Sequence, residues 1–437
     1  QFTIPLMKRF GYSPAFAGGV EATSSMGGQI MPPVMGAVAF IMAETIDVPY
    51  IEICKAAIIP AVLYYFTAFW MVHLEAGRKG LLGLSKEDCP DPWAAIKRQW
   101  HLLLPLVGLV ALLFSGYTPL FSGTVGLGLT VVLIFGAAVL TGVESRALRT
   151  LFWVLLGFAC AGFVQFGVIT FFVVVAVLVV LTYVRRTGAD ARKLAMSALA
   201  EGAMHALPVA IACALVGVII GIINLTGVAA ELGGHIIAIG EKSLFLALVL
   251  TMLTCLVLGM GIPTIPNYII TSSLAAPILL KLGVPLIVSH MFVFYFGIMA
   301  DLTPPVALAA FAAAPIARES GMKIGMQALR VAIAGFIVPY MAVYSPALML
   351  QGGTWLATVY VVFKALVAIG LWGMGAIGFL WSPLNWGERI WAILAASMLV
   401  VALPLTDEVG LGAAAALLAW HWWRSRGFTQ TGHKGGA

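Results

Sequence analysis

Long stretches without a single Asp, Glu, Lys or Arg run through most of this chain and limit what it can fold into. The longest include residues 99–143, 150–184 and 243–280. A helix that crosses a membrane needs about 20 mostly apolar residues, so each of these stretches can hold one or two crossings. Backbone groups in lipid must be paired within the chain, and the ten-residue alternation typical of membrane barrels is missing. The sequence therefore predicts an all-α protein that crosses the membrane several times.

The composition agrees with a membrane protein and excludes several other classes. Of the 437 residues, 62% are hydrophobic and 10% are charged, whereas a soluble protein carries about 25% charged residues. This rules out a soluble enzyme and a nucleic-acid-binding protein. The five cysteines are scattered and form no CxxC motif, so no zinc site is indicated. No paired carboxylates or histidine cluster indicate a membrane enzyme, and we predict neither catalysis nor a cofactor.

Basic residues predict the orientation, because Lys and Arg stay on the cytoplasmic side. With Lys8 inside, Arg78 falls inside after two crossings, and Arg389 falls inside further along. The stretch 150–184 is compatible with one long helix or with an extra pair of short ones. Two crossings that turn near residues 165–167 keep the following basic cluster inside, and we predict this arrangement.

Two segments resemble each other at a fixed offset of 272 residues. The Pro-Pro-Val run at 32–34 matches the run at 304–306, in phase with a match of Gly11 to Gly283. The predicted orientation makes the first copy leave from the inside and the second copy from the outside. Similar sequence in opposite orientation is the inverted repeat typical of secondary transporters. We predict a first repeat at 1–76, a connecting scaffold at 77–205, a second repeat at 206–350 and C-terminal spanning helices at 351–437.

The first copy contains a helix that cannot be continuous. Two prolines follow a Gly-Gly pair in the middle of a predicted span, and proline removes a backbone donor and clashes with the preceding turn. We expect the helix to unwind near residues 26–31 and to resume at 33. The freed carbonyls, together with the hydroxyls of residues 23–25, form a hard-oxygen site that suits a small cation such as Na⁺. The restarting helix points its amides at the same place, which suits an anionic group.

The second copy repeats this break and adds a carboxylate, Asp301, directly before its Thr-Pro-Pro run. An ionisable residue inside a span is a functional candidate. The broken helix is expected over 286–317. Upstream, the stretch 243–281 is interrupted by glycines and a proline at 259–263, which predicts a re-entrant hairpin with its tip near the middle of the membrane. The two breaks and the hairpin tip are expected to form one binding region.

These motifs resemble a known family. The segments Thr-Ser-Ser-Met-Gly-Gly-Gln-Ile-Met-Pro-Pro-Val-Met-Gly at 23–36, Leu-Gly-Met-Gly-Ile-Pro-Thr at 258–264 and Phe-Val-Phe-Tyr-Phe-Gly-Ile-Met-Ala-Asp-Leu-Thr-Pro-Pro-Val-Ala-Leu at 292–308 look like the large membrane subunit of TRAP transporters. The resemblance is closest to the fused permeases that work with TAXI-type binding proteins, and it covers most of residues 1–350.

The resemblance implies an elevator-type importer in the bacterial inner membrane that takes a small organic acid from a periplasmic binding protein and is driven by a sodium gradient. One sodium site would involve Ser24, Ser25, Gly28 and Pro32. The other would involve Gly259, Gly261, Thr264, Asp301, Thr303 and Pro304. The solute would lie between them, near Thr23, Gln29 and Asn267. The expected partners are a TAXI-type binding protein, the small membrane subunit, the solute and the lipid bilayer.

This sequence also departs from the family pattern. The family's first hairpin would begin before residue 1, and the small membrane subunit that is fused upstream in relatives is absent from this sequence. The resemblance therefore predicts an N-terminally truncated permease, and an inactive fragment is one alternative. Another is a sodium-coupled dicarboxylate carrier without a binding protein, although the Ser-Asn-Thr tips expected of such carriers do not occur.

Overall fold

A computed structural model describes residues 2–81, 83, 91–167, 169–401 and 404–431. These residues form helices joined by short turns and contain no strand beyond one isolated bridge between Phe379 and Pro383. The chain divides into two compact units, Gln1–Lys86 with Ala212–Ala437, and Glu87–Ile211. One of the two boundaries, between Ile211 and Ala212, falls within the helix α11 (Ala189–Leu225). The all-α prediction is confirmed. The predicted domain bounds divide the chain by its repeats rather than by compact units, and they stay predictions.

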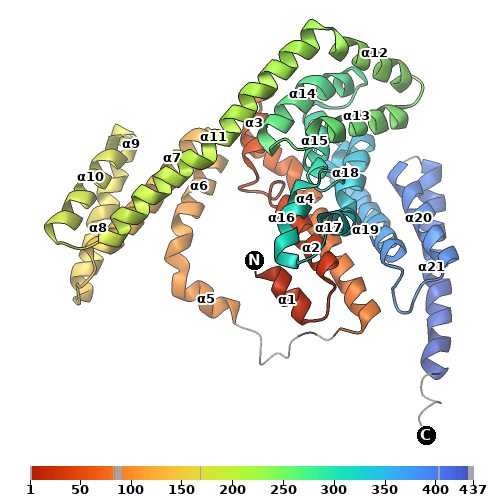
Figure 1. The fold of residues 1–437 in the computed structure, drawn as a ribbon, viewed down its shortest axis with the longest axis horizontal. Coiled ribbons are helices and arrows are strands. Elements are labelled where there is room, and N and C mark those ends of the chain that lie inside the picture. Colours follow the sequence, from red (N-terminus) through yellow and green to blue (C-terminus); the bar gives the residue numbers. More distant parts are fainter. Residues whose placement is uncertain (1, 82, 84–90, 168, 402–403, 432–437) are drawn as a thin grey trace. The chain divides into compact units, whose positions relative to one another are not determined.

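The first unit contains both copies of the repeat. Its first helices are α1 (Thr3–Arg9), α2 (Pro14–Gly27), α3 (Ala37–Thr45) and α4 (Tyr50–Lys79). The last part of α11, from Ala212, follows, and then come α12 (Val228–Gly240), α13 (Leu244–Gly259) and α14 (Thr264–Lys281). The remainder are α15 (Leu286–Ala300), α16 (Leu308–Ala317), α17 (Gly321–Val331), α18 (Ile333–Tyr344), the short 3₁₀ helix η2 (Pro346–Met349), α19 (Trp355–Ile377), α20 (Trp386–Val401) and α21 (Pro404–Thr431). Figure 1 shows these elements along the chain.

The second unit is a smaller helical group with its own core. Its elements are α5 (Pro92–Gln99), η1 (Trp100–Leu103), α6 (Leu104–Phe114), α7 (Pro119–Val139), α8 (Arg146–Ala161), α9 (Phe163–Phe166), α10 (Ile169–Val184) and the first part of α11. The stretch 150–184 is folded as two main helices, α8 and α10, which contact each other. Gly167, between them, has a φ of +63°. The predicted turn near 165–167 is therefore confirmed.

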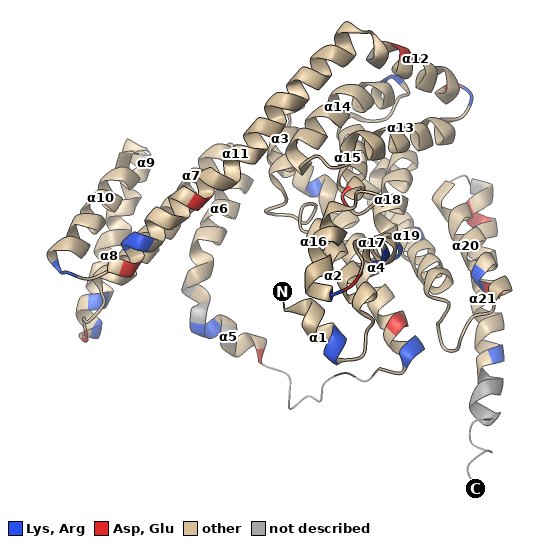
Figure 2. Cartoon of the chain, viewed as in Figure 1, with Lys and Arg blue, Asp and Glu red and all other residues tan. Residues whose placement is uncertain are grey.

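Several helices are long and apolar enough to cross a membrane. In the described part of the chain they are α4, α7, α11 and α19, and α17 with α18 forms a further candidate span that is bent by 41°. Most of the ribbon in Figure 2 is free of charged residues. The breaks in α2–α3 and α15–α16 divide two further apolar segments into shorter helices, as expected for spans that are interrupted at membrane depth.

The two copies have the same backbone. The helices α2 and α15 begin at Pro14 and Leu286, which differ by the predicted offset of 272 residues. The glycines before them, Gly11 and Gly283, have φ values of +97° and +83°. Matching hydrogen bonds occur at the two breaks: Gln29 N to Met26 O and Asp301 N to Ile298 O, Ile30 N to Gly27 O and Leu302 N to Met299 O, and Met35 N to Met31 O and Ala307 N to Thr303 O. The sequence repeat is thus a structural repeat.

Contacts between the copies agree with opposite orientations. The start of the first copy, α1, contacts the end of the second, α16, and Lys8 Nζ donates to Ala317 O at 2.8 Å. The counterpart of α1 in the second copy is α14, and it contacts α3 at the end of the first copy. The start of each copy thus contacts the end of the other copy, which is the arrangement expected of two antiparallel repeats.

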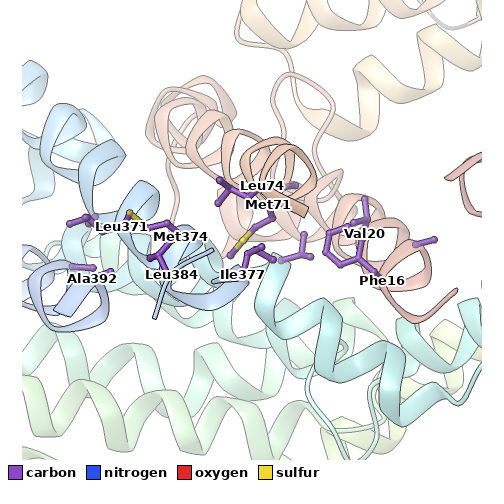
Figure 3. Close-up of a cluster of buried hydrophobic side chains, with 14 of the residues drawn as sticks. Phe16, Val20, Met71, Leu74, Leu371, Met374, Ile377, Leu384 and Ala392 are labelled. Atoms are coloured by element: carbon purple, nitrogen blue, oxygen red, sulfur yellow. The ribbon is translucent and has the colours of Figure 1, made fainter. Parts of the chain in front are cut away.

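A buried hydrophobic core holds the first unit together. Figure 3 shows Phe16 and Val20 of α2, Leu74 of α4 and Met374 of α19 among its members. Each fully buried side chain of this size contributes about 1.5–3 kcal/mol relative to an exposed one. Because the cluster joins the arm before the first break to α4 and α19, it holds that arm in place.

Candidate functional site

The second break is made by Asp301 and the prolines that follow it. The helix α15 ends at Ala300, the peptide bond between Pro304 and Pro305 is cis, and Ala307 has a φ of +39°. Ala309 N donates back to Asp301 O at 3.1 Å, which closes the loop before α16 continues. The break therefore has a defined shape, with Asp301 at the C-terminal end of α15.

The hairpin tip packs directly against this break. A Cβ atom added at Gly259 would lie 2.6 Å from Asn267 Nδ2 and 2.9 Å from Ala300 Cβ. A Cβ atom at Gly261, whose φ is +75°, would lie 3.6 Å from Val306 Cγ1. Contacts this close require glycine at 259. The prediction of a hairpin formed by α13 and α14 is confirmed, and its tip meets the second break.

Three buried oxygen atoms on α14, on α15 and at the second break have no hydrogen-bond partner among the described residues. They are Asp301 Oδ1, Asn267 Oδ1 and the Tyr295 hydroxyl. Asn267 is fully buried and its Nδ2 donates to Gly297 O at 2.9 Å, so its amide is held with the oxygen in a fixed direction. Buried oxygens are usually paired. Carboxylate, amide and hydroxyl oxygens are the ligands that hard cations prefer.

The threonines predicted for this site lie at its edges. Thr303 is half-buried and its hydroxyl donates to Met299 O at 2.7 Å, which leaves the lone pairs of its oxygen available. Thr264 is half-buried at the first position of α14. Pro304 is half-buried as well and contacts α17. The structure thus brings the predicted second-site residues into one region, and their role as ligands stays a prediction.

The first break has the same backbone but a different environment. Tyr64 of α4 donates to Thr23 O at 3.0 Å, and the adjacent Tyr65 donates to Ser24 O at 3.1 Å. Tyr50, at the start of α4, donates to Pro33 O at 2.9 Å and is 3.1 Å from Val34 O. Carbonyls near the end of α2 and in the unwound segment therefore accept hydrogen bonds from tyrosine hydroxyls of the neighbouring helix.

The first break is longer than the sequence predicted. We expected the helix to resume at residue 33, but α3 begins at Ala37, and Met35 has a φ of +49°. Gly36 N donates to Gln29 O at 2.9 Å, which folds the segment into a compact loop. The prediction failed because the chain needs the extra turn after the proline pair before helical bonding can restart.

The predicted first-site and solute residues lie in different surroundings. Ser25 and Gly28 are exposed, and Ser24 and Pro32 are half-buried. The Thr23 hydroxyl is buried and donates to Ala328 O at 3.2 Å. Gln29 is half-buried, with Nε2 3.7 Å from Met26 Sδ. Among the described residues, no hairpin tip lies against this break. The structure therefore shows only the broken-helix side of the first site, and the site stays a prediction.

The helix α17 joins the two breaks. A Cβ atom at Gly19 of α2 would lie 2.9 Å from Ala328 N, and one at Gly325 would lie 3.1 Å from Pro304 Cγ. Tyr64 adds a second link, because a Cβ atom at Gly335 would lie 3.2 Å from its ring and 2.5 Å from Met299 Sδ. The two breaks are thus connected through one intervening layer of side chains.

A comparison with known families decides the assignment. The family model described as Tripartite ATP-independent periplasmic transporter, DctM component, matches residues 1–355. The chain belongs to this family. No curated protein matches the sequence. The chain is therefore a membrane permease of the TRAP type, and the family implies a periplasmic solute-binding protein and a small membrane subunit as partners.

The C-terminal helices of this TRAP permease lie beyond the matched residues and contain buried ion pairs. Lys364 of α19 is 2.9 Å from Asp407 of α21, which also accepts from Tyr360 at 3.2 Å. Glu388 of α20 is paired with Arg424 at 2.9 Å. Lys364, which the sequence places within a span, is therefore neutralised by a partner rather than left free for solute.

The sequence did not lead us to predict that tyrosines of this TRAP permease hydrogen-bond to carbonyls near the first break. The signal was present, because a buried tyrosine hydroxyl needs a partner and Tyr64-Tyr65 is a polar pair in an apolar stretch. The pairing of α4 with α2 could not be derived from spacing, since the bonded residues are 41 positions apart.

Proposed function

We propose that this TRAP permease couples import to the sodium gradient at the second break. The observation that carries the proposal is the hairpin tip at Gly259, which lies against a break that contains the buried carboxylate of Asp301. A carboxylate attracts a monovalent cation, and the buried amide of Asn267 beside the tip has a neutral oxygen with no hydrogen-bond partner among the described residues. The tip is held by close packing, so the ion and the hairpin would stabilise each other.

In this proposal the second sodium site is formed by Gly259, Gly261, Thr264, Asp301, Thr303 and Pro304. The first site would use Ser24, Ser25, Gly28 and Pro32. The solute, a small organic acid, would bind near Thr23, Gln29 and Asn267. No arginine lies at either break, so backbone amides and hydroxyls would carry recognition.

The proposal extends to the partners and the movement. A TAXI-type protein would deliver the solute at the periplasmic face of a bacterial inner membrane, and the module of hairpins and broken helices would move against the remaining helices as an elevator. The motifs at 23–36, 258–264 and 292–308 support the TAXI assignment. The packing of hairpin tip, break and α17 into one body supports a module that moves as a unit.

Reconstitution tests this function. The permease is placed in proteoliposomes with its small subunit and its binding protein, and uptake is followed for the solute that co-purifies with that binding protein. We expect uptake only with sodium outside and the binding protein present. Unchanged uptake with choline in place of sodium would refute the coupling. Uptake without any binding protein would instead support a carrier of the dicarboxylate type.

A further inference from the structure

Two arginines of the first unit converge on the C-terminal end of α19. Arg389 of α20 donates through Nε to Gly375 O at 2.8 Å and through Nη2 to Ala376 O at 3.1 Å. Arg330 of α17 donates to the same Ala376 carbonyl at 2.5 Å. Two guanidinium groups that share one carbonyl oxygen lie within a few ångström of each other, and a neutral carbonyl cannot balance their charge.

The end of α4 adds two more cations and one carboxylate. Arg78 and Lys79 lie 2.7 Å and 3.7 Å from Glu75 Oε1. Arg330 is within electrostatic reach of Arg78, Glu75 and Arg389. Four cations and one carboxylate thus lie at these neighbouring helix ends, and we name Arg78, Lys79, Arg330 and Arg389 the cationic cluster.

The carboxylate next to Arg389 in the chain does not compensate this charge. Glu388 precedes Arg389 in the chain, but its two oxygens are 3.4 Å from His421 and 2.9 Å from Arg424. Within the described residues, the cluster thus carries an excess of positive charge at a helix end. The partial negative charge of the α19 C-terminus offsets about half of one charge.

The cluster still has hydrogen-bond donors to offer. An arginine has five N–H groups, and the described residues occupy two of them in Arg389 and two in Arg330. Gly378, with a φ of +76°, lets the Arg389 guanidinium lie across the helix end, since a Cβ atom there would be 3.3 Å from its Cζ. A ligand with several acceptor oxygens would fill these positions.

Aromatic residues place the cluster at a membrane surface. The Arg389 guanidinium lies 4.6 Å from the centre of the Trp386 ring, and Trp386 and Trp381 are both largely exposed. Exposed tryptophans beside cations mark the level of the lipid headgroups. The positive-inside pattern puts Arg78 and Arg389 on the cytoplasmic side, where anionic lipids attract basic groups.

We propose that the cationic cluster binds the phosphate headgroup of an anionic phospholipid in the cytoplasmic leaflet. Arginine pairs with phosphate through two parallel N–H···O bonds. Arg330 and Arg389 could each donate such a pair of bonds to one phosphate group. A lipid fits better than free phosphate, because its acyl chains would follow the exposed apolar surface beside Trp386. The bound headgroup would join α4, α17, α19 and α20.

Native mass spectrometry of the purified permease, titrated with phosphatidylglycerol or phosphatidylcholine, tests this site. We expect tighter binding of phosphatidylglycerol, weakened about tenfold or more by Arg389→Gln and by Lys79→Gln. Lys79→Gln is included because it removes no hydrogen bond to the end of α19 and should fold normally. Arg318→Gln is the matched control, since Arg318 is the exposed residue that follows the C-terminus of α16, before α17 begins, and its loss should leave affinity unchanged.

Three results would overturn the proposal. Equal affinity for the two lipids would exclude a charge-specific site. Equal affinity of Arg389→Gln, Lys79→Gln and the wild type would place the lipid elsewhere. Displacement of phosphatidylglycerol by inorganic phosphate at comparable concentration would assign the cluster to a free anion rather than to a lipid.

Discussion

The two breaks share one backbone and differ in what surrounds it. At the first, hydroxyls of Tyr50, Tyr64 and Tyr65 donate to carbonyls near the end of α2 and in the loop that follows it. At the second, no such tyrosine hydrogen bond occurs among the described residues. Asp301 and Asn267 each have a buried oxygen without a partner among those residues. These carbonyls of the first copy are satisfied by the protein, whereas the second copy has buried oxygens that a cation would satisfy.

This difference shows that two copies of a repeat can share a backbone and still have different chemical roles. Proline pairs and positive-φ residues produce the same loop twice, because backbone geometry depends on the local sequence. The chemistry depends instead on the packed neighbour, which is α4 at the first break and the hairpin tip at the second. We therefore expect substitutions at the second break to change ion binding there, and substitutions of the tyrosines at the first break to change mainly stability.

The largest effect is expected from Asp301→Asn. The change keeps the shape but removes the negative charge, and contacts to a charged group contribute about 1.5–3 kcal/mol. Sodium affinity, measured by scintillation proximity with radioactive sodium, should fall roughly 10- to 100-fold. Asp190→Asn makes the same change at an exposed position of α11 and should leave affinity unchanged. Normal sodium binding by Asp301→Asn would remove the contrast between the breaks.

Gly259→Ala should follow, with a loss of at least about fivefold in sodium affinity. The new methyl group would overlap Asn267 and Ala300, and overpacking costs about 1–3 kcal/mol. Gly234→Ala is the matched control, since nothing lies within 4 Å of a Cβ atom there. If both variants bind sodium like the wild type, the close fit between tip and break has no part in the site.

Thr303→Val should give a smaller loss. Removal of one hydroxyl oxygen costs about 0.5–1.5 kcal/mol, so sodium affinity should fall roughly 2- to 10-fold in the same assay. Thr303→Ser keeps the hydroxyl and should restore affinity. Equal affinity of the valine and serine variants would show that this oxygen does not contact the ion.

Tyr50→Phe should have the smallest effect on sodium. It removes the hydroxyl bonded to Pro33 O, so the free energy of unfolding should fall by about 0.5–1.5 kcal/mol, seen as a lower melting temperature in detergent. Sodium affinity should stay within about twofold. Tyr117→Phe, at an exposed ring, is the control. A large drop in sodium affinity with unchanged melting would reverse the roles assigned to the breaks.

Much of the fold could be predicted from local sequence. Charge-free stretches predicted the helices, and the proline pairs predicted both breaks, because these features act within a few residues. The start of α3 was misplaced, since turn geometry after two prolines is hard to derive from composition. The tyrosine bonds and the cationic cluster were not predicted, because Arg330 and Arg389 meet at Ala376 only through tertiary packing.

Anomalous diffraction from crystals in which thallium replaces sodium would test the central claim most directly. Thallium(I) takes the place of a monovalent cation and can be located by its scattering. Our account predicts a peak within coordination distance of Asp301 Oδ1, between the hairpin tip and the second break, that is absent in Asp301→Asn. A peak at the first break alone, or no peak at the second, would contradict it.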